Sequence, residues 1–206
     1  MYWYEEEVQR LEKERAELTY KPSAVFYGSS SIRLWQTLQE DFHEYKPVNL
    51  GFGGSTLAAC VWYFDRTVAP YSPDLLILYA GDNDLGDGRK PEEVFIFFQQ
   101  FVARTKQRFG DQLPCYFLSL KPSPSRLNLL ENFTYTNHLI ETYILRQHHH
   151  NWKFINIFDQ MLNKSGEPKN AYFDVDGLHM NPMGYELWTG IIRGNIPPAV
   201  LTDPKL

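Results

Sequence analysis

The sequence predicts an α/β sandwich in which about five parallel strands lie between two layers of helices. Short runs that are apolar throughout alternate with amphipathic segments along most of the 206-residue chain. Such strands are typical of parallel sheets covered on both faces, and an intervening helix lets successive strands run in the same direction. Hydrophobic residues make up 43% of the chain, enough for one substantial domain, whereas two full domains would be cramped.

The expected strands are the five short apolar runs. They occupy residues 24–27 (AVFY), 47–50 (PVNL), 74–80 (DLLILYA), 114–120 (PCYFLSL) and 153–158 (KFINIF). None of the apolar runs is long enough to cross a bilayer. Helical segments lie between them, as the sandwich requires.

The expected helices show apolar residues at helical spacing. Residues 4–18 form a strongly charged segment with a thin apolar stripe, while Ile32, Leu34, Leu38 and Phe42 fit one helix. Further helices are expected at about 57–68, 91–109, 129–148 and from Pro182 onward, with Asn181 as N-cap of the last.

No internal repeat or low-complexity linker divides the chain. We therefore expect a single domain over residues 1–206. Within it, residues 1–20 contain the charged N-terminal helix, residues 24–193 form the core, and residues 194–206 form a C-terminal tail. The sequence leaves the oligomeric state open.

Composition argues against several classes of partner and cofactor. The formal net charge of −5 provides no basic surface for nucleic acid or anionic membranes. Cys60 and Cys115 lie in apolar stretches without a CxxC motif, which indicates buried free thiols. Successive side chains of His148–His150 would point about 100° apart on a helix, so they cannot converge on one ion. We expect neither a metal nor a cofactor.

The N-terminal segment does not resemble a signal peptide, because no basic stretch followed by an apolar stretch is present. A cytoplasmic location is therefore expected for the chain as it stands. A secreted or periplasmic location is expected only if the natural chain is longer.

Ligands of open α/β sheets bind at the carboxyl ends of the strands. The first two expected strands are followed by Gly28-Ser29-Ser30-Ser31 and by NLGFGGST (49–56), and the third by AGDNDL (80–85). Each segment alone is consistent with an ordinary turn or helix cap. A glycine also permits close approach of a backbone N–H to a ligand, and the Asn83 amide could donate a hydrogen bond.

The strongest local signal is DVDGLHMNP (174–182), just before the last expected helix. Asp176 precedes His179 by three residues, with Gly177 between them to let the loop turn back. A carboxylate at this spacing can hold the imidazole Nδ1–H and leave Nε2 free as a base. Ser30 and His179 are 149 positions apart, so only the fold could bring them together.

These four segments, in this order, resemble the SGNH or GDSL-type hydrolase superfamily of esterases and lipases. GSSSIRLW, NLGFGGST, YAGDND and DGLHMNPMGY are similar to the corresponding segments of bacterial GDSL-like lipases and acylhydrolases whose first block reads Gly-Ser-Ser-Ser. The resemblance covers residues 24 to about 193 and implies a flavodoxin-like three-layer α/β/α sandwich.

The resemblance implies a catalytic serine esterase. Ser30 would be the nucleophile, His179 the general base and Asp176 the group that orients His179. The N–H groups of Ser30 and Gly54 and the Asn83 side chain would bind the oxyanion. Ser31 is expected to start a helix. Ser29 replaces the usual aspartate of the Gly-Asp-Ser block, so any support that this aspartate gives the turn must come from elsewhere.

The sequence leaves the acyl and alcohol parts of the substrate open. We expect a small-molecule ester with a short acyl chain such as acetyl, with a carbohydrate as one candidate for the alcohol, since no long apolar insertion could form an interfacial lid. Lysophospholipase or thioesterase activity on the same residues is an alternative, and so is a non-catalytic module that binds acetylated glycans. A flavodoxin-like phosphate- or nucleotide-binding domain would leave Asp176 and His179 unexplained. After the fourth strand, Arg126 or Lys121 could bind a polar substrate, although a Pro-rich loop with solvated charges is the simpler interpretation.

Overall fold

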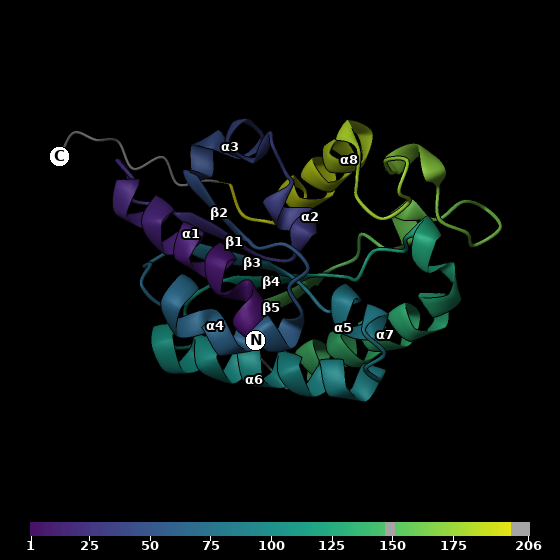
Figure 1. The fold of residues 1–206 in the computed structure, drawn as a ribbon, viewed down its shortest axis with the longest axis horizontal. Helices are drawn as coiled ribbons and strands as arrows, with labels where there is room; N and C mark the ends of the chain where they lie inside the picture. Colours follow the sequence, from purple (N-terminus) through teal and green to yellow (C-terminus); the bar gives the residue numbers. More distant parts are fainter. Residues whose placement is uncertain (147–150, 199–206) are drawn as a thin grey trace.

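A computed structural model describes residues 1–146 and 151–198, and it contains a five-stranded, fully parallel sheet (Figure 1). The strand order is β2-β1-β3-β4-β5. The strands are β1 Ala24–Gly28, β2 Pro47–Gly51, β3 Leu75–Tyr79, β4 Cys115–Leu118 and β5 Trp152–Ile155. The predicted fold class is therefore confirmed. The three histidines at 148–150 and most of the expected C-terminal tail lie outside the described residues.

Helices cover both faces of this sheet. In Figure 1, α4, α6 and α7 lie below the sheet, and α2, α3 and α8 lie above it. The α-helices are α1 Glu5–Glu17, α2 Ser30–Arg33, α3 Leu38–Asp41, α4 Leu57–Thr67, α5 Asp82–Gly86, α6 Pro91–Phe109, α7 Leu130–Arg146 and α8 Pro182–Arg193. Single turns of 3-10 helix occur at Tyr2–Tyr4, His43–Tyr45, Asp159–Met161 and Asn170–Tyr172, with a longer one at Pro124–Leu129. No described helix is long and apolar enough to span a membrane.

The sheet separates two hydrophobic cores, which explains why its central strands are apolar throughout. On β1, Val25 and Tyr27 pack into the core under α1, α4, α6 and α7. Ala24 and Phe26 point to the opposite face and join the core under α2, α3 and α8. Successive side chains of a strand alternate between its faces, so a strand buried on both must be apolar at every position.

The register places the ends of neighbouring strands side by side. Gly28, the last residue of β1, pairs with Gly51 of β2 on one side and with Tyr79 of β3 on the other. The segments that leave these three strands therefore begin at the same edge of the sheet. This is the edge at which the sequence predicts a binding site.

Helix ends follow the signals in the sequence. Asn181 precedes α8, and its side chain accepts a hydrogen bond from the Gly184 N–H. Thr56 caps α4 in the same way, through the Ala59 N–H. Both bonds satisfy N–H groups that the first helical turn leaves unpaired.

The prediction of one helix containing Ile32, Leu34, Leu38 and Phe42 was wrong. Two four-residue helices, α2 and α3, stand in its place. Trp35 lies in the turn between them, only 2% exposed, and its Nε1–H donates to Asp41 at 2.7 Å, whereas Leu34 is 38% exposed. Burial of the large Trp35 ring thus outweighs the continuous helical periodicity. Ser31 is likewise not the first residue of a helix, because α2 begins at Ser30 with Ser29 as its N-cap residue.

Candidate active site

The turn after β1 places Ser30 at the start of α2. Gly28 has φ +142°, and a Cβ atom built on it would lie 1.8 Å from the carbonyl oxygen of Tyr79. Only glycine fits such a close approach of β1 to β3. The next residue, Ser29, donates its N–H to the same Tyr79 carbonyl at 3.0 Å. The chain then turns directly into α2, with the half-buried Ser30 at the edge of the sheet.

A compact turn before α8 holds Asp176 against His179. Asp176 Oδ1 accepts the N–H groups of Leu178 and His179, each at 2.9 Å, and Oδ2 lies 2.5 Å from His179 Nδ1. Gly177, with φ +63°, provides the left-handed residue between them. Because one carboxylate binds both the backbone and the ring, the imidazole is fixed with Nδ1 toward Asp176.

The other ring nitrogen of this histidine faces Ser30. His179 Nε2 lies 3.2 Å from Ser30 Oγ, which is within hydrogen-bond reach for a hydroxyl donating to an imidazole. The fold therefore brings Ser30, His179 and Asp176 into one chain of contacts. A hydroxyl, an imidazole and a carboxylate in this order form an arrangement that can support acyl transfer.

The surroundings of Asp176 favour the ionised form of its carboxyl group. Its partial burial would raise the pKa of the carboxyl group, but the hydrogen bonds from the Leu178 and His179 N–H groups and from the His179 ring lower that pKa to about 2. The carboxylate therefore stays ionised throughout the ordinary pH range. A fixed negative charge at Nδ1 would stabilise an imidazolium if Nε2 took up a proton.

Hydrogen bonds join the loops after β1, β2 and β3 beside Ser30. Ser55 Oγ donates to the Gly28 carbonyl at 2.9 Å, and Asn83 Nδ2 donates to the Ser55 carbonyl at 3.0 Å. Within the described residues, the N–H groups of Ser30 and Gly54 have no hydrogen-bond acceptor. The chain segments after β1, β2 and β3, which carry the predicted oxyanion donors, are therefore tied directly to one another.

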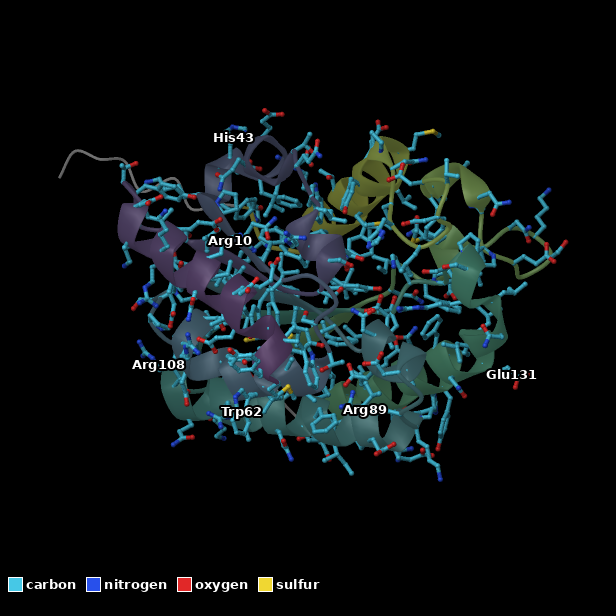
Figure 2. The ribbon with its side chains drawn as sticks, in the orientation of Figure 1. Arg10, His43, Trp62, Arg89, Arg108 and Glu131 are labelled. Atoms are coloured by element: carbon cyan, nitrogen blue, oxygen red, sulfur yellow. The ribbon has the colours of Figure 1, made fainter. Side chains whose placement is uncertain are left out.

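The N-terminal segment also contacts this region, which the sequence did not indicate. Tyr4 donates its hydroxyl to the Gly54 carbonyl at 3.0 Å. Arg10 of α1, labelled in Figure 2, donates to the Gly51 carbonyl at 2.9 Å. Tyr4 appeared in the sequence only as part of the apolar stripe, so nothing in the local pattern predicted a contact 50 residues away.

The loop after β4 contributes a buried set of charges. Lys121 is 1% exposed, so the interpretation of this loop as one with solvated charges is wrong for Lys121. Its Nζ lies 3.7 Å from Asp82 Oδ2 and 3.3 Å from Ser123 Oγ. Arg126 bonds to the backbone of Asp82 and to the side chain of Asn83, both at 2.8 Å. A buried charge needs such partners because burial without them is strongly unfavourable.

Asp84 has a structural environment that the sequence did not reveal. Its side chain is fully buried and accepts the N–H groups of Leu57 and Ala58 at the start of α4. Burial raises the pKa of Asp84 to about 6, against the lowering effect of these N–H groups and of Arg89. Asp84 thus links α5, which also carries Asn83, to α4, which follows the loop with Gly54.

A hollow of about 650 Å³ opens beside His179, between α8 and the α2–α3 segment. Its lining is mixed: Leu34, Met180 and Tyr185 contribute apolar surface, and Thr37 and Thr189 contribute hydroxyl groups. Three carboxylates, those of Asp41, Asp174 and Glu186, also line it, and no lysine or arginine is found among its described lining residues. A group attached to an ester at Ser30 could occupy this space.

Side chains of metal-ligating types and two free thiols occur among the described residues. Within them, no group of three or more His, Cys, Asp or Glu side chains is close enough together to hold a metal ion. Cys60 and Cys115 are buried free thiols, and burial raises the pKa of each.

Comparison with known families identifies the family of this chain. The model of the GDSL-like lipase/acylhydrolase family matches residues 18–187. The chain belongs to this family. The resemblance seen in the sequence is therefore confirmed. In this family member Ser29 is buried, and its hydroxyl has no hydrogen-bond partner among the described residues.

Solved structures with the same fold include two proteins from Bacteroides species and an acetyl xylan esterase. A Bacteroides fragilis protein described as an acylhydrolase superposes with a TM-score of 0.78 at 22% identity, over 90% of this chain and 93% of that one. A GDSL-like lipase from Bacteroides thetaiotaomicron gives a TM-score of 0.73 at 21% identity, over 91% and 95%. An acetyl xylan esterase gives 0.68 at 17% identity, over 84% and 99%. A search of curated proteins found no match for this family member.

Proposed function

We propose that this protein hydrolyses carboxylic esters through an acyl-enzyme intermediate on Ser30. The observation that carries the proposal is the contact chain from Ser30 Oγ to His179 Nε2 at 3.2 Å and from His179 Nδ1 to Asp176 at 2.5 Å. A binding module would not need a base aimed at a serine and an acid aimed at that base. The alternative of a non-catalytic glycan-binding module is therefore the weaker one.

In the proposed reaction, His179 Nε2 takes the Ser30 hydroxyl proton as Oγ attacks the ester carbonyl. The tetrahedral intermediate then collapses, the bond to the alcohol oxygen breaks, and the imidazolium returns its proton to the leaving alcohol. Water activated by His179 next attacks the acyl-Ser30 carbonyl and releases the acid. Asp176 keeps the ring oriented and balances its positive charge in both half-reactions.

The oxyanion would be bound by the N–H groups of Ser30 and Gly54 and by the Asn83 amide. The two N–H groups have no acceptor among the described residues, and one of the two amide hydrogens of Asn83 remains available after its bond to Ser55. In enzymes of this chemical type, the loss of one such donor slows the reaction by about 10²–10³-fold.

We further propose that the substrate is a short-chain, acetyl-type ester of a neutral polyhydroxylated alcohol such as a sugar. One similarly folded protein is an acetyl xylan esterase, at 17% identity. The hollow beside His179 combines hydroxyl-bearing and apolar side chains, a mixture that suits a sugar ring, and its three carboxylates disfavour an anionic alcohol.

Hydrolysis of p-nitrophenyl acetate tests the reaction type. We expect turnover by the wild-type protein and loss of nearly all of it in Ser30→Ala and His179→Ala. Ser165→Ala and His43→Ala are matched controls, because both residues are exposed and lie outside the site; His43 is labelled in Figure 2. Equal rates in the wild type and both site variants would refute an esterase.

A substrate series tests the finer proposal. We expect the rate to fall as the acyl chain of p-nitrophenyl esters is lengthened, and acetylated xylose to react faster than acetylated glycerol phosphate. Glu186→Gln should reduce this discrimination against the anionic alcohol while leaving p-nitrophenyl acetate hydrolysis unchanged. A preference for long acyl chains would instead favour lysophospholipase or thioesterase activity.

A further inference from the structure

Arg126 occupies an irregular position in the loop after β4 that aims its side chain at α5. It lies within the Pro124–Leu129 turn but has non-helical backbone angles, φ −122° and ψ 30°. Its guanidinium lies against Gly86, where a Cβ atom would come within 3.0 Å of Arg126 Cζ. The side chain is only 19% exposed, and its guanidinium contacts α5, the short helix that carries Asn83.

The guanidinium forms two short hydrogen bonds with adjacent residues of α5. Nη1 donates to the Asp82 carbonyl and Nη2 donates to Asn83 Oδ1, both at 2.8 Å. The two acceptors belong to neighbouring residues, so one planar, charged donor holds the Asn83 side-chain oxygen in a fixed position relative to the Asp82 backbone. The Asn83 side chain is therefore held by a group that cannot itself accept a hydrogen bond.

This contact decides which way the Asn83 amide faces. A guanidinium has only donors, so it binds the oxygen of the amide and would repel its NH₂ group. With Oδ1 turned toward Arg126, the NH₂ group must point to the opposite side, where one hydrogen binds the Ser55 carbonyl at 3.0 Å. The other hydrogen is left for a ligand at the edge of the sheet.

Buried charges hold Arg126 in this position. Asp82 Oδ2 lies 3.5 Å from Arg126 Nη1 and 3.7 Å from Lys121 Nζ, and the side chains of Asp82 and Lys121 are 5% and 1% exposed. Burial lowers the pKa of Lys121, and the charge of Asp82 opposes this effect. Turning Arg126 outward would remove one of the partners of a nearly buried carboxylate, which is costly.

We infer that Arg126 is a positioning residue that orients the Asn83 amide to bind the oxyanion, and not a residue that binds substrate. The inference builds on the proposed esterase function, since it assigns a role in that reaction. It replaces the expectation that Arg126 contacts a polar substrate, because its donors on this side are already used by Asp82 and Asn83.

Kinetics of single and double variants test the inference. We expect Arg126→Ala to lower kcat by about 10–100-fold, no more than the loss of an oxyanion donor itself, with KM nearly unchanged. Arg126→Lys should recover only part of the rate, because an ammonium group cannot form the same pair of bonds. Arg104→Gln is the matched control, since Arg104 forms an ion pair with Asp65 on the surface of the domain.

The decisive comparison is Asn83→Ala with Asn83→Ala/Arg126→Ala. If Arg126 acts through Asn83, the double variant is no slower than Asn83→Ala alone, and added methylguanidine restores activity to Arg126→Ala but not to the double variant. Multiplicative losses, or a rise in KM confined to anionic substrates, would overturn the inference and return Arg126 to substrate binding.

A measurement that does not depend on activity separates this inference from the proposed function. The side-chain NH₂ signals of Asn83 in an ¹⁵N spectrum are identified by their loss in Asn83→Ala. They should shift and broaden in Arg126→Gln while signals of the α6 backbone stay in place. Unchanged Asn83 signals would refute the positioning role even in an active esterase, and shifted signals in an inactive protein would refute only the esterase.

Discussion

The hydroxyl group of Tyr4 donates a 3.0 Å hydrogen bond to the carbonyl oxygen of Gly54. This contact joins the N-terminal turn to the loop whose N–H is proposed to bind the oxyanion. The family model begins only at residue 18, so the supporting contact comes from outside the matched region. Ion pairs of Arg66 with Glu5 and Glu12 fasten α1 to α4 and so hold Tyr4 in place.

Tyr4→Phe should therefore slow the proposed reaction without disturbing the core. The ring, which packs edge-on against Phe52 at 5.6 Å, is retained, and only the hydroxyl is lost. We expect kcat to fall several-fold and the free energy of unfolding to fall by about 1 kcal/mol, as for one lost hydrogen bond. Tyr2→Phe is the control, since Tyr2 is 88% exposed. An unchanged kcat in Tyr4→Phe would show that Gly54 needs no such support.

Asp176→Asn tests the role of the fixed charge beside His179. An asparagine can still accept the Leu178 and His179 N–H groups, so the turn should persist, but the charge that stabilises the imidazolium is lost. The fall in kcat should be about 10–10³-fold, less than the roughly 10⁴-fold found for a buried triad aspartate, because the Asp176 side chain is 48% exposed. Kinetics on p-nitrophenyl acetate, with circular dichroism to verify folding, would measure it; a wild-type rate would contradict the proposed role.

The pH dependence of stability should report the burial of Asp84. Its pKa is about 6 in the folded protein and 3.8 without burial, so the folded state binds the proton more tightly between these values. Linkage then requires the stabilising contribution of protonated Asp84 to be complete below about pH 4 and lost as the pH rises through about 6. The difference corresponds to about 3 kcal/mol.

Urea unfolding of the wild type and of Asp84→Asn at several pH values measures this effect. The wild type should lose stability relative to the variant between pH 4 and pH 7, because asparagine cannot ionise. Asp65→Asn, which changes an exposed carboxylate, serves as the control for general charge effects. A constant difference between wild type and Asp84→Asn over this range would contradict the prediction.

Gly28→Ala should strongly destabilise the protein. The new Cβ would overlap the Tyr79 carbonyl oxygen at 1.8 Å, and φ +142° is unfavourable for alanine. The free energy of unfolding should fall by about 3–5 kcal/mol. Gly190→Ala is a matched control within α8, where a Cβ meets nothing within 4 Å, and it should stabilise by about 0.5–1 kcal/mol. Similar effects of the two substitutions would contradict the steric explanation.

Much of the architecture could be predicted because it depends on local patterns. The apolar runs at 24–27 and 47–50 became β1 and β2 with each end within one residue, and the segment 91–109 became α6 with the expected bounds. Strands buried on both faces must be apolar at every position, so they are visible in the sequence as runs of consecutive apolar residues.

The errors arose where tertiary packing outweighed local periodicity. Trp35 interrupts the expected helix because its burial is worth more than an unbroken helical pattern. Asp82–Gly86 form a short helix that turn-forming residues did not predict, and Lys121 is buried although a lysine is usually exposed. Lys121, for example, is held by Asp82, which lies 39 residues earlier in the chain (121 − 82).

By itself, the sequence determined the order of strands and helices, the edge of the sheet where polar residues gather, and the pairing of Asp176 with His179 three residues apart. Only the tertiary structure decided that His179 Nε2 approaches Ser30 Oγ, that Arg126 turns toward Asn83, and that Tyr4 supports Gly54. The reason is physical. Hydrophobic periodicity and turn-forming residues act over a few positions of the chain. These contacts depend instead on which strands lie side by side in the sheet and on how packing in the two cores orients each side chain.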